Sequence, residues 1–172
     1  MGTLTVDNLN VNGTLTADGL GKVLQVVQTT KTDTFSTSSA TFTDLTGMSV
    51  NITPVNSSNK VLVFVNTNAS TSSTYNTMFN LVRGSTDIFK GDVGGGSQSR
   101  ATSQARHTDS NGSLNVVFHF LDSPSTTSQV TYKVQIMAQS GGTSYVNRTS
   151  SDSNSQGIAR ITSTITAIEV GA

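Results

Sequence analysis

A succession of short runs rich in Val, Ile, Leu and Phe, separated by turns of Gly, Asn and Ser, constrains the fold of this chain more than any other feature. In Val130–Gln139 every second residue is apolar, which is the pattern of a half-buried strand. No segment shows a convincing helical period. Short strands divided by such turns predict an all-β, antiparallel, jelly-roll-like sandwich over residues 21–172.

About ten runs carry the strand pattern, and residues 97–107 alternate weakly. Gly84–Thr86 joins two of the runs and predicts a hairpin with a short loop. Pro54 ends another run, because proline has no N–H to donate to a strand ladder. The expected strands are Val23–Gln28, Thr41–Leu45, Met48–Ile52, Lys60–Asn66, Tyr75–Arg83, Asp87–Lys90, Leu114–Leu121, Val130–Gln139, Thr143–Asn147 and Ile158–Val170.

The most apolar of these runs is Lys60–Asn66, in which both faces of the expected strand are apolar. Both faces should therefore be buried. One face can cover the core of the sandwich, and the other can cover a second sheet edge or a sister subunit. We expect Val61, Val63 and Val65 to lie in an interface with a sister subunit.

The low charge of the chain limits the kinds of partner that we expect it to bind. Only 12% of the residues are charged, about half the usual share, and the formal net charge is zero. The Lys and Arg residues are scattered, so the sequence lacks the positive excess of a nucleic-acid binder. The chain has no cysteine, no apolar run of membrane-spanning length and no signal peptide at its start. We therefore expect synthesis in a cytoplasm, with no nucleic acid and no membrane as partners.

An internal repeat occupies the first twenty residues, where Gly2–Asp7 returns as Gly13–Asp18 with one change of apolar residue. A repeat this short cannot bury its own apolar side chains, because a single ribbon has no second layer. Residues 1–20 are therefore predicted to be an attachment arm or short shaft that needs sister chains or another protein. The predicted attachment residues are Leu4, Val6, Leu9, Val11 and Leu15.

No motif of the sequence predicts catalysis. The glycine-rich segment Gly91–Arg100 lacks the Lys-Ser/Thr pair of a phosphate loop, and no Gly-x-Ser-x-Gly elbow occurs. His107 and His119 could share a metal ion with a carboxylate, but a structural role is the simpler interpretation. Pairs of loop Asp residues could serve glycoside cleavage, an alternative that spacing leaves open. We expect no enzyme activity, no cofactor and no metal site.

Several segments resemble a β-domain found in structural proteins of tailed bacteriophages, especially marine and cyanobacterial phages. The resemblance begins at Gly21–Val27 and covers roughly residues 21–170. It implies a homotrimer with jelly-roll or tumour-necrosis-factor-like heads, and Val61, Val63 and Val65 would then form the trimer interface. The arm resembles the short β-repeats of phage fibre shafts. The other matching segments are Phe35–Val50, Ser49–Pro54, Lys60–Val65, Phe79–Gly84, Phe120–Pro124, Tyr132–Val134 and Ser163–Glu169.

Two roles are compatible with this resemblance. The favoured one is a trimeric capsid decoration (cement) or head-fibre protein of a virion, whose arm binds the major capsid protein. The alternative is a tail-fibre tip or baseplate protein that is attached to a tail protein and binds a host surface glycan through the loops Gly91–Arg106, Ser140–Ser144 and Arg148–Gly157. A depolymerase would need a catalytic motif, and a secreted ligand would need an export route. The predicted recognition residues in exposed loops are Arg100, Arg106, Tyr145 and Arg148.

Overall fold

The computed structural model describes residues 22–72 and 74–171, which form eleven strands and no helix. The strands vary in length from three to twelve residues. Their bounds are β1 Val23–Lys31, β2 Phe35–Thr37, β3 Thr43–Ile52, β4 Lys60–Thr71, β5 Asn76–Arg83, β6 Thr86–Phe89, β7 Ser103–Arg106, β8 Leu114–Asp122, β9 Val130–Ala138, β10 Ser144–Val146 and β11 Ser163–Val170.

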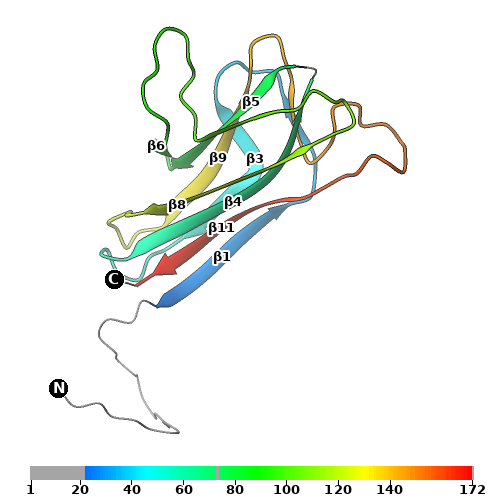
Figure 1. Ribbon diagram of the computed structural model, residues 1–172. Coiled ribbons are helices and arrows are strands. Elements are labelled where there is room, and N and C mark those ends of the chain that lie inside the picture. The colour runs from blue at the N-terminus through cyan, green and yellow to red at the C-terminus, as the bar shows by residue number, and fades with distance from the viewer. Residues whose placement is uncertain (1–21, 73, 172) are drawn as a thin grey trace, which may run out of the picture.

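The strands form two antiparallel sheets that pack face to face (Figure 1). In sheet A, β8, β4, β11 and β1 lie side by side, and the short strands β10 and β2 continue beyond β11 and β1. In sheet B the order is β3, β9 and β5, and both β6 and β7 pair with the far edge of β5. The chain crosses repeatedly between the sheets, which is the jelly-roll-like arrangement of an antiparallel sandwich. The predicted fold class is confirmed.

Several strand boundaries differ from the sequence-based prediction. The two runs on either side of Gly47 form one strand, β3, because Gly47 adopts a φ of +83° at an irregularity in the pairing with β9. β4 continues five residues past Asn66, and β11 begins at Ser163 instead of Ile158. The three-residue strand β2 was not predicted. The hairpin at Gly84 is confirmed, with Arg83 and Thr86 as partners.

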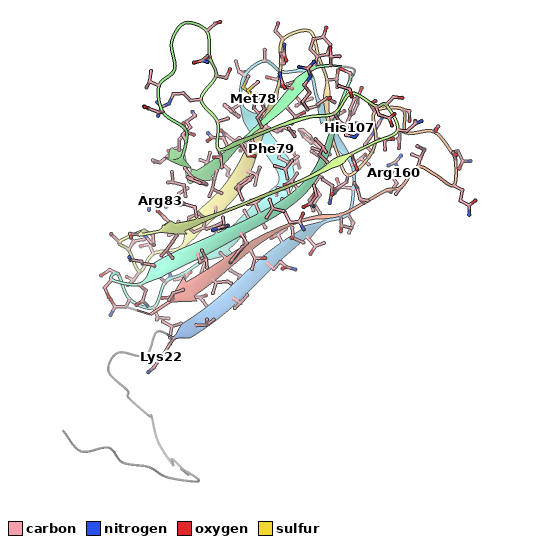
Figure 2. The ribbon with its side chains drawn as sticks, viewed as in Figure 1. Lys22, Met78, Phe79, Arg83, His107 and Arg160 are labelled. Atoms are coloured by element: carbon pink, nitrogen blue, oxygen red, sulfur yellow. The ribbon has the colours of Figure 1, made fainter. Side chains whose placement is uncertain are left out.

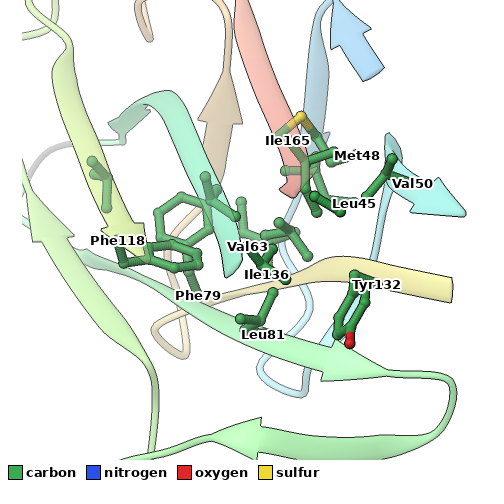
Figure 3. Packing of buried hydrophobic residues seen from close by; sticks show 14 of the residues in the cluster. Leu45, Met48, Val50, Val63, Phe79, Leu81, Phe118, Tyr132, Ile136 and Ile165 are labelled. Carbon is green, nitrogen blue, oxygen red and sulfur yellow. The ribbon is translucent and has the colours of Figure 1, made fainter. Parts of the chain in front are cut away.

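The core lies between the two sheets and is made largely of Val, Ile, Leu and Met (Figure 3). Sheet A contributes Val63, Phe118 and Ile165, and sheet B contributes Phe79 and Ile136 among others. The predicted alternation of Leu114–Leu121 and Val130–Gln139 is confirmed, since alternate side chains of β8 and β9 point into this core. β-Branched side chains suit this packing, because they fit closely on a pleated surface.

The predicted trimer interface at Val61, Val63 and Val65 is wrong. All three side chains are 0% exposed and belong to the core of the subunit itself (Figure 3 shows Val63). Strand geometry places alternate side chains on opposite faces, so the other face of β4 carries Leu62 and Phe64. The three valines therefore serve the core of the subunit.

A buried carboxylate stabilises the end of sheet A that lies near Lys22. Glu169, the only glutamate of the chain, is fully buried and accepts hydrogen bonds from Gln25, Asn59 and the Val55 amide, the last two at 2.6 and 2.8 Å. Burial by itself would raise the pKa of Glu169, but these hydrogen bonds outweigh it and hold the pKa below its ordinary value. The carboxylate thereby joins β1, β11 and the turn between β3 and β4.

A matched pair of substitutions tests whether Val63 belongs to the core of the subunit. Val63→Ala should lower the free energy of unfolding by about 2 kcal/mol, because it removes two buried methyl groups and leaves a cavity. Val93→Ala removes the same atoms from a side chain that is 72% exposed and lies outside the two sheets, and it should change the free energy by less than about 0.5 kcal/mol. Urea unfolding measures both values, and equal losses would contradict the assignment.

Glu169→Gln should reduce stability at neutral pH and flatten the dependence of stability on pH. At pH 7 we expect a loss of about 1–3 kcal/mol, because the glutamine NH₂ would face another N–H donor in either orientation, the Gln25 NH₂ in one and the Asn59 NH₂ and Val55 amide in the other. A carboxylate with a lowered pKa in the folded state stabilises the fold above its ordinary value of 4.5 and loses this effect as the pH falls through the lowered value. Urea unfolding of both proteins at pH 7 and pH 3 should therefore show the larger acid loss in the wild type.

Candidate functional site

The outer face of sheet A presents apolar side chains across four neighbouring strands. Val26 of β1 lies opposite Ile168 of β11, Ile168 lies opposite Leu62 of β4, and Leu62 lies opposite Leu121 of β8. This row is continuous because the register of each pair brings an outward apolar residue to the same level. With its neighbours it forms what we call the apolar face, which comprises Val23, Leu24, Val26, Leu62, Phe64, Val117, Leu121, Ile168 and Val170.

The apolar face is open to solvent in the single subunit. The described residues include nine large apolar side chains that are exposed, and six of them belong to this face. Val23, Val26 and Val117 are each more than half exposed. An extended apolar patch of this kind marks a surface that contacts another molecule, because monomeric proteins rarely leave one in water.

The apolar face carries almost no charge. The row beside Val26, Ile168, Leu62 and Leu121 contains only uncharged strand partners of Phe64 and the ring of His119, which lies 5.6 Å from the Phe64 ring; its members are Gln28, Thr166, Phe64 and His119. Lys60 is at the margin of the face, where β4 begins. Sheet B differs from sheet A in its charge. The ion pair Lys133–Asp44 at 2.7 Å joins two of its strands, and the ion pair Lys90–Asp87 at 2.6 Å lies beside them.

Two of the predicted recognition residues, Tyr145 and Arg148, lie together at the end of sheet A opposite Lys22. The Arg148 guanidinium sits 4.6 Å from the centre of the Tyr145 ring. It also donates to the carbonyls of Thr149 and Ser150 within its own loop. Arg148 therefore holds the loop that follows β10, and both residues are only partly exposed.

Arg100 and Arg106 lie elsewhere, on the side of sheet B. Arg100 is in the loop after β6, and its Nε donates to the carbonyl of Gly91 at 2.8 Å. Arg106 ends β7 and pairs with Asn76 at the start of β5. Both are exposed as expected, but the structure does not gather the four predicted recognition residues into one site.

The structure brings together two of the three loops that the sequence suggested for recognition. Residues of Gly91–Arg106 and Ser140 line one groove of about 660 Å³ on the outer side of sheet B. The third loop, Arg148–Gly157, lines a smaller hollow of about 230 Å³ where Arg160 binds Asp152 at 2.7 Å. Figure 2 labels Arg160, which follows this loop and lies far from Lys22.

The other predicted features do not correspond to a site among the described residues. Within residues 22–72 and 74–171, no three His, Asp or Glu side chains are grouped so that they could hold a metal ion. The same residues include no helix long and apolar enough to cross a membrane. The predicted attachment residues lie outside the described part of the chain, as does the proposed arm as a whole. These attachment residues are Leu4, Val6, Leu9, Val11 and Leu15.

Comparison with known proteins gives likenesses in structure but none in sequence. No protein-family model and no curated protein matches the sequence. The structure is similar to that of VP2 in the crystal structure of an infectious bursal disease virus subviral particle. The two chains are 15% identical with a TM-score of 0.35, and the match covers 97% of this chain. It covers 44% of the VP2 chain, so this chain spans less than half the length of that protein.

The sequence showed that both faces of β4 are apolar, but it did not predict that Leu62 and Phe64 form the exposed face. The available signal was the alternation of β8, in which Val117 and Leu121 lie on the face opposite to that of the inward phenylalanines. Once β8 is paired with β4, Leu121 meets Leu62 and the outward row becomes apparent. That pairing is a contact between distant segments, and the local pattern does not contain it.

Proposed function

We propose that this protein is a structural component of a bacteriophage virion, a homotrimeric capsid decoration (cement) or head-fibre protein attached through residues 1–20. The observation that carries the proposal is the uncharged apolar face of sheet A. A surface of this chemistry excludes water when it meets a partner and gains about 25 cal/mol for each Å² of apolar area buried. Such a face suits permanent assembly better than transient contact, because obligate interfaces are the more apolar class.

The lack of charge favours a sister subunit as the partner of the apolar face. Where the faces of three subunits converge on a three-fold axis, each side chain lies close to its own copies, so a charged face would bring like charges together. The apolar face has no acidic side chain on its four central strands to create this repulsion, and Lys60 lies only at the margin. The trimer proposed from the resemblance thus acquires a specific interface, which replaces the one first expected.

The arm supports attachment to a larger particle. Its repeated apolar residues need a partner, and it precedes Lys22 at the same end of the sandwich where Val23 and Leu24 begin the apolar face. In the proposed arrangement the heads associate through sheet A and the arms bind the major capsid protein. The alternative is attachment to a tail protein, which would place the same trimer on a fibre tip or baseplate.

Charge introduced into the apolar face should dissociate the trimer without unfolding the subunit. We expect Val26→Asp and Leu121→Asp to weaken association at least about tenfold, because each buries a carboxylate without a partner. Val93→Asp is the matched control, since Val93 is an exposed valine outside the face. Sedimentation equilibrium gives the mass, and circular dichroism confirms folding. A wild-type monomer, or a trimer that tolerates both substitutions, would reject the interface.

Deletion of residues 1–20 should release the protein from virions and leave a folded, trimeric head. Purified particles reconstituted with full-length or shortened protein allow the bound amount to be measured by quantitative mass spectrometry. We expect binding to fall to background for the shortened protein. If the shortened protein instead becomes monomeric, the arm is a trimerisation element and the proposed division of labour is wrong.

The copy number of the chain in virions tests the location. A decoration protein covers the capsid lattice, so its abundance should approach that of the major capsid protein. Quantitative mass spectrometry of purified particles with labelled reference peptides measures this ratio. A ratio of a few hundredths or less would instead assign the protein to the tail or to a single vertex.

A further inference from the structure

The groove beside the glycine-rich loop has a chemistry unlike that of the apolar face. Its floor contains Met78 and Met137, which are direct partners across β5 and β9. Both methionines are almost completely buried, so a small part of each side chain lines the floor between polar walls. A volume of about 660 Å³ lies within the range of pockets that hold small organic ligands. Figure 2 labels Met78 at this end of the sandwich.

The walls of the groove present amide and hydroxyl groups in place of cations. Its amides come from Asn76, Gln98, Gln104 and Gln139, and its hydroxyls come from three serines. Asp92 is its one ionisable lining residue, and Arg100 is turned away to bond the Gly91 carbonyl. A groove without a lining cation does not favour phosphate, sulfate or carboxylate ligands, because their charge would lose water without gaining an opposite charge.

Hydrogen bonds hold three of the amides in fixed positions. The Oε1 of Gln139 accepts from both the backbone and the side-chain nitrogen of Asn76, at 3.1 and 2.6 Å. The Nε2 of Gln104 donates to the Oδ1 of Asn76 at 3.3 Å. This arrangement leaves the NH₂ of Gln139 and the carbonyl of Gln104 for a ligand, and they are a donor and an acceptor. Their orientation costs a ligand little entropy because the protein has already set it.

The glycine-rich loop closes over one side of the groove. The Gly91 amide donates to the Ala101 carbonyl at 3.1 Å and joins the two ends of the loop. Within it, the side chain of Gln98 folds against Gly94 so closely that a Cβ at Gly94 would lie 2.0 Å from Gln98 Oε1. A side chain at position 94 would therefore displace the end of the Gln98 side chain.

We propose that this groove binds a neutral saccharide. Adjacent hydroxyl groups of a sugar both donate and accept hydrogen bonds, which matches the free NH₂ of Gln139 and carbonyl of Gln104. The C–H face of a sugar ring can pack on Met78 and Met137, since methionine adapts to irregular apolar surfaces. The inference goes beyond the proposed function, because the groove lies on sheet B and the assembly face lies on sheet A. Three grooves on a trimer would strengthen weak single contacts through multivalency.

Nuclear magnetic resonance titration of the full-length protein tests the proposal. The probes are maltotetraose, an N-acetylglucosamine tetrasaccharide and a mannose tetrasaccharide, with tetragalacturonic acid as the anionic comparison. We expect at least one neutral probe to shift the side-chain amide resonances of Gln104 and Gln139 with a dissociation constant on the order of 1 mM. No such shift with any neutral probe, or equal binding of tetragalacturonic acid, would overturn the proposal.

Substitutions then locate the site. Gln139→Ala and Gln104→Ala should each weaken the neutral probe about tenfold, because each removes a positioned hydrogen-bonding group. Gln28→Ala is the control, since Gln28 is an exposed glutamine that bonds a neighbouring strand of sheet A. Unchanged affinity in both groove variants would overturn the assignment, whether or not the protein is a trimer. Dissociation of the trimer with saccharide affinity intact would reject the assembly interface alone.

Discussion

The structure depends on β4, which pairs with β11 and β10 on one edge and with β8 on the other. Its inward valines fill the centre of the core, and the fold would be complete with polar residues on its outward side. Leu62 and Phe64 occupy that outward side instead. An apolar residue that the core does not use adds nothing to the folding of one subunit and exposes it to aggregation. The outward side of β4 therefore indicates a partner more directly than any other strand does.

The fold class could be predicted from the sequence because it depends on local patterns. Alternation in β8 and β9 identified both the strands and their buried faces, and Gly84 identified the hairpin. The strand β2 could not be found in this way, since three residues carry no period and β10 supplies the partner that makes them a strand. The unbroken β3 was missed because Gly47 resembles a strand end in sequence, whereas a single positive φ lets the strand pass through it.

The sites were harder to predict, because they depend on register between strands far apart in the chain. A strand with two apolar faces does not reveal which set of alternate residues points inward, so Val63 and Leu62 were equivalent in sequence. The pairing with β8 and β11 breaks this equivalence. The groove is a similar case, since β7 and β9 bring Gln104 and Met137 beside Met78 on β5. No local pattern links these three residues.

The two outer faces of the sandwich present different kinds of side chain. Sheet A presents apolar and amide side chains, whereas sheet B presents the ion pairs of Lys133 and Lys90 together with the groove. If sheet A is covered in a trimer, sheet B faces outward, because the two sheets form opposite faces of the described sandwich. The ion pairs of sheet B would then keep the assembled head hydrated, and the groove would remain open after assembly. In the proposed trimer, burial of sheet A and exposure of sheet B therefore occur together.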